Sequence, residues 1–367
     1  LERRGLEHQL VEPSQAPLLR GLGDVEPPDL DGRVAVAVPD HTRPVPLVEV
    51  LRVLEPLLPR ALLIFATGTH PMGRGDAERL LGPYGGAVRY KIHDCRGSHT
   101  YVGTTGRGLR VEVDSDFAAA DRRVTVGLVA PHPWSGFSGG SKVVLPGVSS
   151  LRTVVEHHLR WYSAGRPAVL EGNPFREEID EAGRLAKVDW SLNLVLDGGG
   201  KLVYAAAGDP QRSFRECVEV AERLYVRRVE GRFDSAVVFA DPLDIDFYQA
   251  TKALEHAAPA VEEGGSIVLV ASCSRGFGSE EFERYVRMGA EEVRRRIEGG
   301  AVENLVPAIV ALRFKEIAET RSLTLLCESG LEVPGAAPSK SAHEALERLR
   351  GRVLVVARGG FTVPVVR

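Results

Sequence analysis

Apolar and polar positions follow one another in the pattern expected for strands that alternate with helices. In the first half, apolar runs rich in β-branched residues predict buried strands at 34–39, 61–67 and 124–130. An amphipathic stretch at 46–57 predicts a helix between the first two strands. Residues 190–209 instead carry two apolar runs around a Gly-rich turn, which predicts a hairpin. We therefore expect a mainly parallel sheet covered by helices.

A second α/β series follows a long helical stretch that begins at residue 212. The elements predicted there are strands at 234–240, 266–271, 322–326 and 353–357, and helices near 248–260, 279–289, 301–319 and 342–350. A chain of 367 residues is too long for one ordinary core, since single cores seldom exceed about 250–300 residues. We predict two α/β domains with mainly parallel sheets, 1–230 and 231–367, with the active site in the cleft between them.

The composition narrows the class of protein. Hydrophobic residues make up 44% of the chain and charged residues 26%, as in globular proteins. The formal net charge of −4 gives no general attraction to nucleic acid or anionic membranes, and no apolar run reaches the roughly 18 residues of a membrane span. The first residues lack the apolar stretch of a secretion signal, and the four cysteines form no Cys-x-x-Cys pair. We expect a cytoplasmic protein that binds neither nucleic acid nor membranes.

Three polar clusters come directly after three of the predicted strands. DHTRP at 40–44 follows the first strand, GTH at 68–70 the second and PHPW at 131–134 the third. Because ligands of open parallel sheets bind beyond the carboxyl ends of the strands, we expect the clusters to face one crevice. The same residue types also serve in turns and caps, so a structural role stays open for each cluster.

A Gly-rich segment, GFSGGSK at 136–142, comes next. Such a turn lets backbone N–H groups converge on an anion, and Lys142 adds a positive charge. The spacing is not that of a P-loop, because Val143 rather than Ser or Thr follows the lysine. By itself the segment is weak evidence for an anion site, and a flexible turn is the alternative.

Two adjacent histidines lie in the helix predicted after this segment. His157 and His158 point about 100° apart on a helix, so both cannot easily face one metal. A single imidazole that faces a cleft can bind Ni, Zn, Cu or Fe, although a surface or core role is the alternative. The sequence has no HExxH motif and no paired cysteines, so a metal here needs ligands from elsewhere.

In the second half, the sequence DIDFYQATK at 244–252 leads into a predicted helix. Gln249 and Lys252 are three residues apart and share a helical face near its N-terminus. An amide, an ammonium group and a helix N-terminus together suit a carboxylate, while an ordinary first turn with a solvated lysine is the alternative.

Together these segments resemble the lactate racemase family, which carries a nickel-pincer nucleotide, a dithio derivative of nicotinic acid mononucleotide. The matching segments occur in order through most of the chain: DHTRPVP (40–46), GTH (68–70), PHPWSGFSGGSKVVLPG (131–147), EGNPFREEIDEA (171–182), DFYQATKALEHAAPAVEEGGSIVLVASCSRGFGS (246–279) and GGFTVP (359–364). The string at 131–147 is specific, whereas GTH or GNP alone would mean little.

The resemblance implies how the first domain holds the cofactor. It makes Lys142 the residue tethered to the cofactor through a thioamide. It makes His158 the imidazole that completes the square plane of the nickel, whose other ligands are two sulfurs and a ring carbon of the cofactor; this geometry and these soft ligands suit Ni(II). The further positions assigned to cofactor binding are Asp40, Thr42, Ser138, Gly139 and Gly140.

The resemblance also implies the chemistry. A histidine deprotonates the substrate hydroxyl while the Cα hydride moves to the pincer carbon, and return of the hydride to the other face inverts the centre. His70 and His132 are the two opposed acid–base groups. The positions that hold the substrate are Arg43, Tyr248, Gln249 and Lys252, with Arg43 suited to bidentate binding of a carboxylate.

The implied substrate is a small 2-hydroxy acid, and enzymes that build the cofactor are the implied maturation partners. Lactate-specific relatives often place a Trp over the substrate, near the start of the helix at 301–319. This chain has Leu305 there, so a substrate whose side chain is longer than that of lactate remains an alternative.

Two other functions remain alternatives at this stage. A metal-dependent hydrolase would use His70, His132 and His158 as ligands and would keep its metal without Lys142. A nucleotide-binding protein without catalytic activity would show no turnover and would tolerate replacement of His70. Neither accounts for Lys142 together with the order of the motifs.

Overall fold

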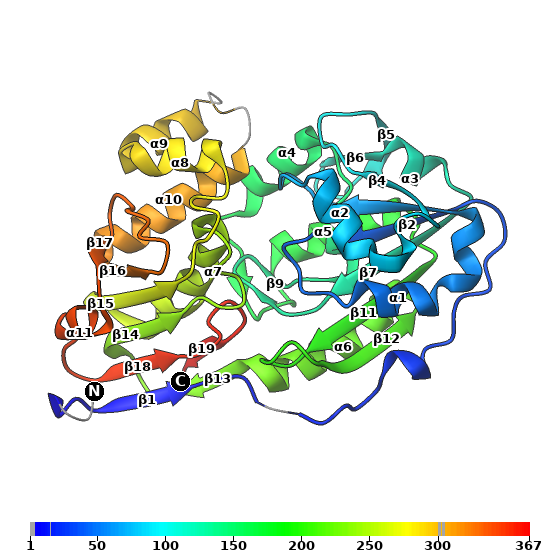
Figure 1. Cartoon of the computed structure of the whole chain (residues 1–367). Helices are drawn as coiled ribbons and strands as arrows, with labels where there is room; N and C mark the ends of the chain where they lie inside the picture. The colour runs from blue at the N-terminus through cyan, green and yellow to red at the C-terminus, as the bar shows by residue number, and fades with distance from the viewer. Residues whose placement is uncertain (1–3, 15, 300–301, 303–304) are drawn as a thin grey trace. The chain divides into compact units, whose positions relative to one another are not determined.

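The computed structural model describes all residues except 1–3, 15, 300–301 and 303–304 (Figure 1). It contains two compact units. One comprises the described residues of 15–130 and 134–224, and the other those of 1–14, 131–133 and 225–367. The N-terminal residues belong to the second unit because β1 (His8–Val11) pairs in parallel with β18 (Val353–Val356).

The unit of 15–130 and 134–224 is built on a six-stranded sheet in the order β12-β11-β7-β2-β3-β4. All neighbours are parallel except β11 and β12, which form the predicted hairpin. The strands are β2 (Val34–Pro39), β3 (Ala61–Ala66), β4 (Arg89–Ile92), β7 (Arg122–Leu128), β11 (Trp190–Leu196) and β12 (Leu202–Gly208). Every residue of β11 is buried, because helices cover both faces of such a sheet.

Helices and short strands surround this sheet. They are η2 (Leu22–Asp24), α1 (Leu47–Val53), η3 (Glu55–Arg60), α2 (Arg74–Leu81), η4 (Gly82–Tyr84), α3 (Ser115–Ala119), η5 (Gly140–Val143), α4 (Leu151–Trp161), α5 (Pro174–Leu185) and α6 (Pro210–Tyr225), with the hairpin β5 (His99–Thr104)–β6 (Arg110–Asp114) and the pair β9 (Ser135–Phe137)–β10 (Arg166–Pro167). The helix predicted at 46–57 is α1 followed by η3, where Pro59 lacks the N–H that an α-helix would need.

The other unit has its own six-stranded sheet, all parallel, in the order β1-β18-β14-β15-β16-β17. Its elements besides β1 and β18 are β8 (Pro131–His132), β13 (Val226–Val229), β14 (Phe233–Phe239), α7 (Phe247–Ala257), η6 (Ala258–Ala260), β15 (Val261–Ala271), α8 (Glu280–Arg287), α9 (Ala290–Glu298), α10 (Leu305–Thr320), β16 (Ser322–Cys327), β17 (Ala337–Ser339), α11 (Ala342–Glu347) and β19 (Val363–Val366). The predicted α/β class with mainly parallel sheets is confirmed.

Within the described part of the chain, no helix is both long enough and apolar enough to cross a bilayer.

Candidate active site

Two of the predicted strand-end clusters meet at the edge of the first sheet. β2 and β3 are parallel neighbours, and their last residues Pro39 and Ala66 are paired. The segments that follow bring Nδ1 of His70 to 2.8 Å from a carboxylate oxygen of Asp40. The other carboxylate oxygen accepts the backbone N–H of Thr42 at 2.9 Å and its hydroxyl at 2.5 Å. Asp40 is buried, and both of its carboxylate oxygens take part in hydrogen bonds.

The charge of Asp40 determines which ring nitrogen of His70 carries the hydrogen. Burial by itself raises the pKa of Asp40, but the charges and hydrogen bonds of His70, Arg43 and Thr42 outweigh it and hold the pKa well below its usual value. An ionised Asp40 favours the His70 tautomer with hydrogen on Nδ1, in which Nε2 carries the lone pair. Asp40 thus acts as the orienting partner of His70, a contact that the sequence analysis did not predict.

The Gly-rich turn is held from both sides. Gly139 and Gly140 have φ angles of 78° and 56°, which favour glycine. The N–H of Gly140 donates to Oδ1 of Asn193 on β11 at 2.9 Å. A Cβ at Gly140 would lie 2.8 Å from the ring of Phe214 and 2.9 Å from the guanidinium of Arg176. These two glycines are therefore required by packing and backbone conformation.

Ser138 ties the same turn to the end of β7. Its hydroxyl donates to the carbonyl of Leu128 at 2.7 Å and accepts the N–H of Ala130 at 3.1 Å. The side chain is buried, so in this structure its polar atom is occupied by backbone groups.

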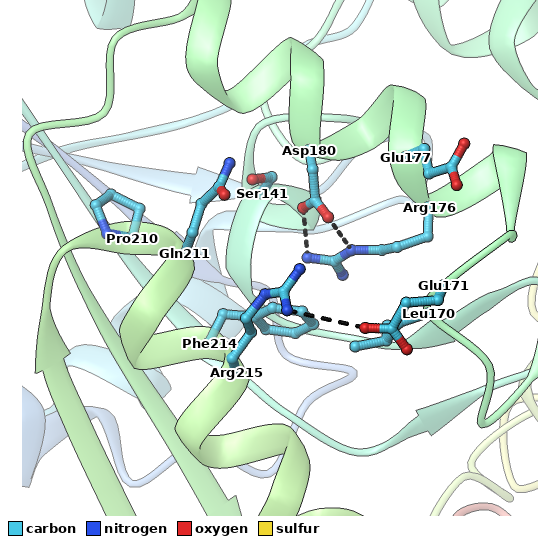
Figure 2. Close-up of a pocket in the computed structure, with 10 residues that line it drawn as sticks. All are labelled: Ser141, Leu170, Glu171, Arg176, Glu177, Asp180, Pro210, Gln211, Phe214 and Arg215. Carbon is cyan, nitrogen blue, oxygen red and sulfur yellow. Dashed lines mark hydrogen bonds and ion pairs between the residues drawn. The ribbon is translucent and has the colours of Figure 1, made fainter.

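Arg176 is the largest side chain buried behind the turn, with 2% of its surface exposed. It donates to both carboxylate oxygens of Asp180, at 2.9 and 2.7 Å, and to the carbonyls of Phe137 and Gly139 at 3.3 and 3.4 Å. Its guanidinium lies 3.7 Å over the ring of Phe214. Figure 2 shows this arrangement beside a cavity of about 140 Å³ between α5 and the start of α6.

Lys142 follows this turn in a cationic environment. Burial lowers the pKa of Lys142 to about 7, and the positive charges of Arg43 and Arg176 contribute in the same direction. A substantial fraction of the amine is therefore neutral near pH 7. A neutral amine is the nucleophilic form, which is the state required to form an amide-like bond.

The two histidines of α4 have different partners. His158 Nδ1 lies 2.8 Å from the carbonyl of Val154, and since a carbonyl only accepts, Nδ1 carries the hydrogen. Nε2 of His158 is then left with its lone pair, as a metal ligand requires. His157 Nε2 donates to the carbonyl of Phe175 at 3.0 Å. Burial lowers the pKa of His157 to about 3, so His157 is neutral.

The ring of His158 lies in an aromatic pocket. Its centroid is 5.8 Å from that of Trp134 and 5.0 Å from that of Phe175. Burial lowers the pKa of His158, and the neighbouring imidazole of His157 and amine of Lys142 lower it further. A neutral imidazole in an apolar surrounding is the form that binds a transition metal.

Asn173 links the chain segments that form the aromatic pocket around His158. Its amide N–H groups donate to the carbonyls of Trp134 and Val169, at 2.9 and 3.0 Å, and its Oδ1 accepts the N–H of Arg176 at the start of α5. The sequence analysis assigned no role to Trp134, Asn173 or Arg176. Their only signal was that they lie within the matching strings 131–147 and 171–182.

The remaining predicted residues belong to the other unit. His132 lies in β8 and is half-buried. The carboxylate of Asp246, which caps the start of α7, accepts the N–H of Gln249 at 2.7 Å, and on α7 Lys252 Nζ donates to Oε1 of Gln249 at 2.5 Å. The predicted shared face of Gln249 and Lys252 is thus observed. Tyr248 is 9% exposed.

Leu305 is the first residue of α10 and is buried, with 1% of its surface exposed. The described side chains contain no group of three or more His, Cys, Asp or Glu residues that could hold a metal ion.

Comparisons with known proteins identify the family. The model of the lactate racemase N-terminal domain matches residues 10–168, and that of the C-terminal domain matches residues 237–301. The chain belongs to the lactate racemase family. The lactate racemase of Thermoanaerobacterium thermosaccharolyticum is 30% identical over 69% of this chain, and that of Lactiplantibacillus plantarum is 29% identical over 68%. The matches span 63% and 62% of those two relatives.

A solved structure of a lactate racemase agrees with this assignment. The structure of the lactate racemase apoprotein from T. thermosaccharolyticum superimposes with a TM-score of 0.80 at 25% identity, covering 92% of this chain and 87% of that one. A Thermotoga maritima protein shares the fold with a TM-score of 0.70 at 18% identity, covering 92% and 94%.

Proposed function

We propose that this member of the lactate racemase family is an isomerase that inverts the Cα of a small 2-hydroxy acid, lactate or a related acid, with the help of a nickel-pincer nucleotide. The observation that carries the proposal is the proximity of the buried Lys142 amine to the imidazole of His158. Lys142 has a nucleophilic amine, and it lies close enough to His158 for its charge to lower the pKa of that imidazole.

These residues fit the proposed cofactor. Lys142 would form the covalent tether, and His158 would offer the lone pair of Nε2 to the nickel, because its Nδ1 is committed to the Val154 carbonyl. The protein supplies a single imidazole here, which suits a metal whose other ligands come with the cofactor. When bound, the cofactor would accept the Cα hydride of the substrate and return it.

We assign the removal of the proton from the substrate hydroxyl to the two histidines. In the His70 tautomer that Asp40 favours, Nε2 is the nitrogen that would take up this proton, and Asp40 would stabilise the imidazolium that forms. We assign the same task for the opposite enantiomer to His132. Two bases are needed because a planar 2-keto intermediate is attacked from either face.

Substrate binding is proposed for Arg43, Tyr248, Gln249 and Lys252. Arg43 donates to the carbonyl and hydroxyl of Thr42 at 3.2 and 2.9 Å through one terminal nitrogen, which fixes the guanidinium beside Asp40. The Lys252–Gln249 hydrogen bond places an ammonium group and an amide on one face of α7. A carboxylate is the ligand that such donors prefer. Leu305 would form an apolar wall that admits a side chain longer than that of lactate.

The proposal requires enzymes that build the cofactor. Producing the chain together with these enzymes allows a direct test. The full chain should be produced with the cofactor-building enzymes of a lactate racemase system and with nickel, then measured by intact-mass spectrometry. We expect an adduct of nucleotide size that maps to Lys142 and is missing in Lys142→Arg. Unmodified protein would contradict the proposal, provided that a known lactate racemase made in parallel carries the adduct.

A further inference from the structure

Two cysteines lie side by side at the carboxyl edge of the second sheet. β15 and β16 are parallel neighbours in which Ala271 is paired with Cys327. Cys273 comes two residues after the end of β15 and has a φ of 49°, so the chain turns sharply there. Sγ of Cys327 lies 3.4 Å from the carbonyl of Ser272, the residue before Cys273, and the Cys327 thiol is close enough to Cys273 to raise its pKa.

We propose that Cys273 and Cys327 are a disulfide-forming pair, a covalent modification site that reacts with low-molecular-weight disulfides. The Cys327 sulfur lies against the peptide group that leads into Cys273, so a local movement of the turn at 272–273 would bring the two sulfurs to bonding distance. Neither cysteine is in a disulfide in the structure, and the same holds for Cys95 and Cys217. Cys95 and Cys217 belong to the other unit, so neither competes from within the same sheet.

The two cysteines differ in their access to solvent, and this difference sets the order of events. Cys327 is partly exposed, and its sulfur also lies 3.1 Å from the hydroxyl of Ser329. Cys273 is fully buried. Burial raises the pKa of the Cys273 thiol, and the neighbouring Cys327 raises it further, so Cys273 is a poor first nucleophile. Reaction with a reagent in solution therefore begins at Cys327.

The reaction balances with oxidised glutathione as the oxidant. The Cys327 thiolate attacks one sulfur of the reagent, forms a mixed disulfide and releases one glutathione thiolate, which takes up the proton that Cys327 lost. The Cys273 sulfur then attacks the Cys327 sulfur of the mixed disulfide, loses its own proton and releases the second glutathione. The two protein thiols lose two electrons and two protons, and one glutathione disulfide becomes two thiols.

The bond would restrain a loop that leads into α7. The N–H groups of Ser272 and Cys273 donate to the side chain and the carbonyl of Asp244, at 3.0 and 2.7 Å. The N–H of Phe247, the first residue of α7, donates to the carbonyl of Gly276 at 2.9 Å. A covalent link at Cys273 should therefore slow amide exchange in residues 272–278 and in the first turn of α7.

The test uses the full chain in buffers of oxidised and reduced glutathione, with acid quenching and peptide mapping. We expect a Cys327 mixed disulfide at early times. A Cys273–Cys327 bond should replace it, with a loss of two hydrogen atoms from the intact mass and of two of the four titratable thiols. Cys273→Ser should retain the mixed disulfide at Cys327. Cys327→Ser should form neither product, and Cys95→Ser should behave as the unchanged chain.

Three results would overturn the proposal. The first is four free thiols after equilibration in fully oxidised glutathione. The second is a bond that links Cys95 or Cys217 instead. The third is a mixed disulfide at Cys327 that never resolves although Cys273 is intact. Since Cys273→Ser alters a buried position, circular dichroism must show the folded state of that variant. If Cys273→Ser does not fold, the results for the unchanged chain and for Cys327→Ser test the proposal.

Discussion

At the scale of single residues, the account depends on how neighbours change two reactive side chains. Lys142 and His70 are both recognisable in the sequence, but their chemical states are set by groups that are distant along the chain. Arg176 contributes its charge to the environment of Lys142, and Asp40 holds the imidazole of His70. The sequence predicts that these residues react, and the structure shows which neighbours would make them reactive.

The reactivity of Lys142 can be measured without the cofactor. In competitive acetylation of the apoprotein with trace acetic anhydride, the labelling of Lys142 should rise with a midpoint near pH 7, because its pKa is about 7. Lys201, which is exposed, serves as the internal reference. Arg176→Met should move the Lys142 midpoint to higher pH, since a nearby positive charge is removed. A midpoint above about pH 9 in the unchanged protein would contradict the assigned environment.

Asp40 should matter for turnover more than for substrate binding. Asp40→Asn keeps the shape of the side chain but removes the charge that stabilises a protonated His70. We expect kcat to fall about 10²- to 10⁴-fold with a small change in KM. Asp121→Asn is the control, because Asp121 also pairs with a cation, Arg33, but does so at the surface. Equal activity of the Asp40→Asn and Asp121→Asn variants would remove Asp40 from the mechanism.

At the scale of elements, the sequence predicts the sheets well but predicts the packing of the Gly-rich turn at 136–142 poorly. β2, β3, β7 and the β11–β12 hairpin follow from buried apolar runs and a Gly-rich turn. The edge strand β4 was missed because its sequence RYKI is short and mainly polar. The Gly-rich turn indicated an anion site, yet its glycines are also required by the ring of Phe214 and the guanidinium of Arg176. A packing partner so distant in sequence leaves no local pattern.

The turn can be tested with two alanine substitutions. Gly140→Ala and Gly200→Ala both place a Cβ on a residue with positive φ, 56° and 81°, so each should cost about 1–2 kcal/mol. Only Gly140→Ala also clashes with Phe214 and Arg176, while the space at Gly200 is open. We expect urea unfolding to show an additional cost of about 1–3 kcal/mol for Gly140→Ala. Equal costs would mean that the turn is not tightly packed.

At the scale of the whole molecule, buried neutral histidines should make the fold sensitive to mild acid. The pKa values of His157, at about 3, and His256, at about 4, are lowered by burial, and that of His158 is lowered as well. Below pH 6.5 the unfolded chain binds protons at these positions that the folded chain does not. This stabilisation is therefore complete above pH 6.5 and is lost as the pH falls toward the folded values.

Urea unfolding between pH 7.5 and 5 measures this effect. The free energy of unfolding should fall by up to about 1.4 kcal/mol per pH unit for each such histidine. His157→Gln should reduce the slope, whereas His343→Gln should not, because His343 is exposed on α11. A free energy that stays constant over this range would contradict the assigned protonation states.

The sequence analysis placed the domain boundary at residue 230 and did not predict the N-terminal strand. β1 pairs with β18, which is almost at the other end of the sequence, and its four residues carry no strong pattern. Long-range pairing of a short edge strand cannot be predicted from local periodicity.

The central claim is inversion of a 2-hydroxy acid at Cα by hydride transfer. It is tested most directly by incubating the cofactor-bearing protein with one enantiomer of lactate deuterated at Cα, followed by chiral separation and mass spectrometry. The account predicts that both enantiomers appear in equal amounts, that the deuterium is retained at Cα, and that Lys142→Arg shows no conversion. If a panel of 2-hydroxy acids, lactate included, stays unconverted, or if the deuterium is replaced by solvent hydrogen during inversion, the account is contradicted.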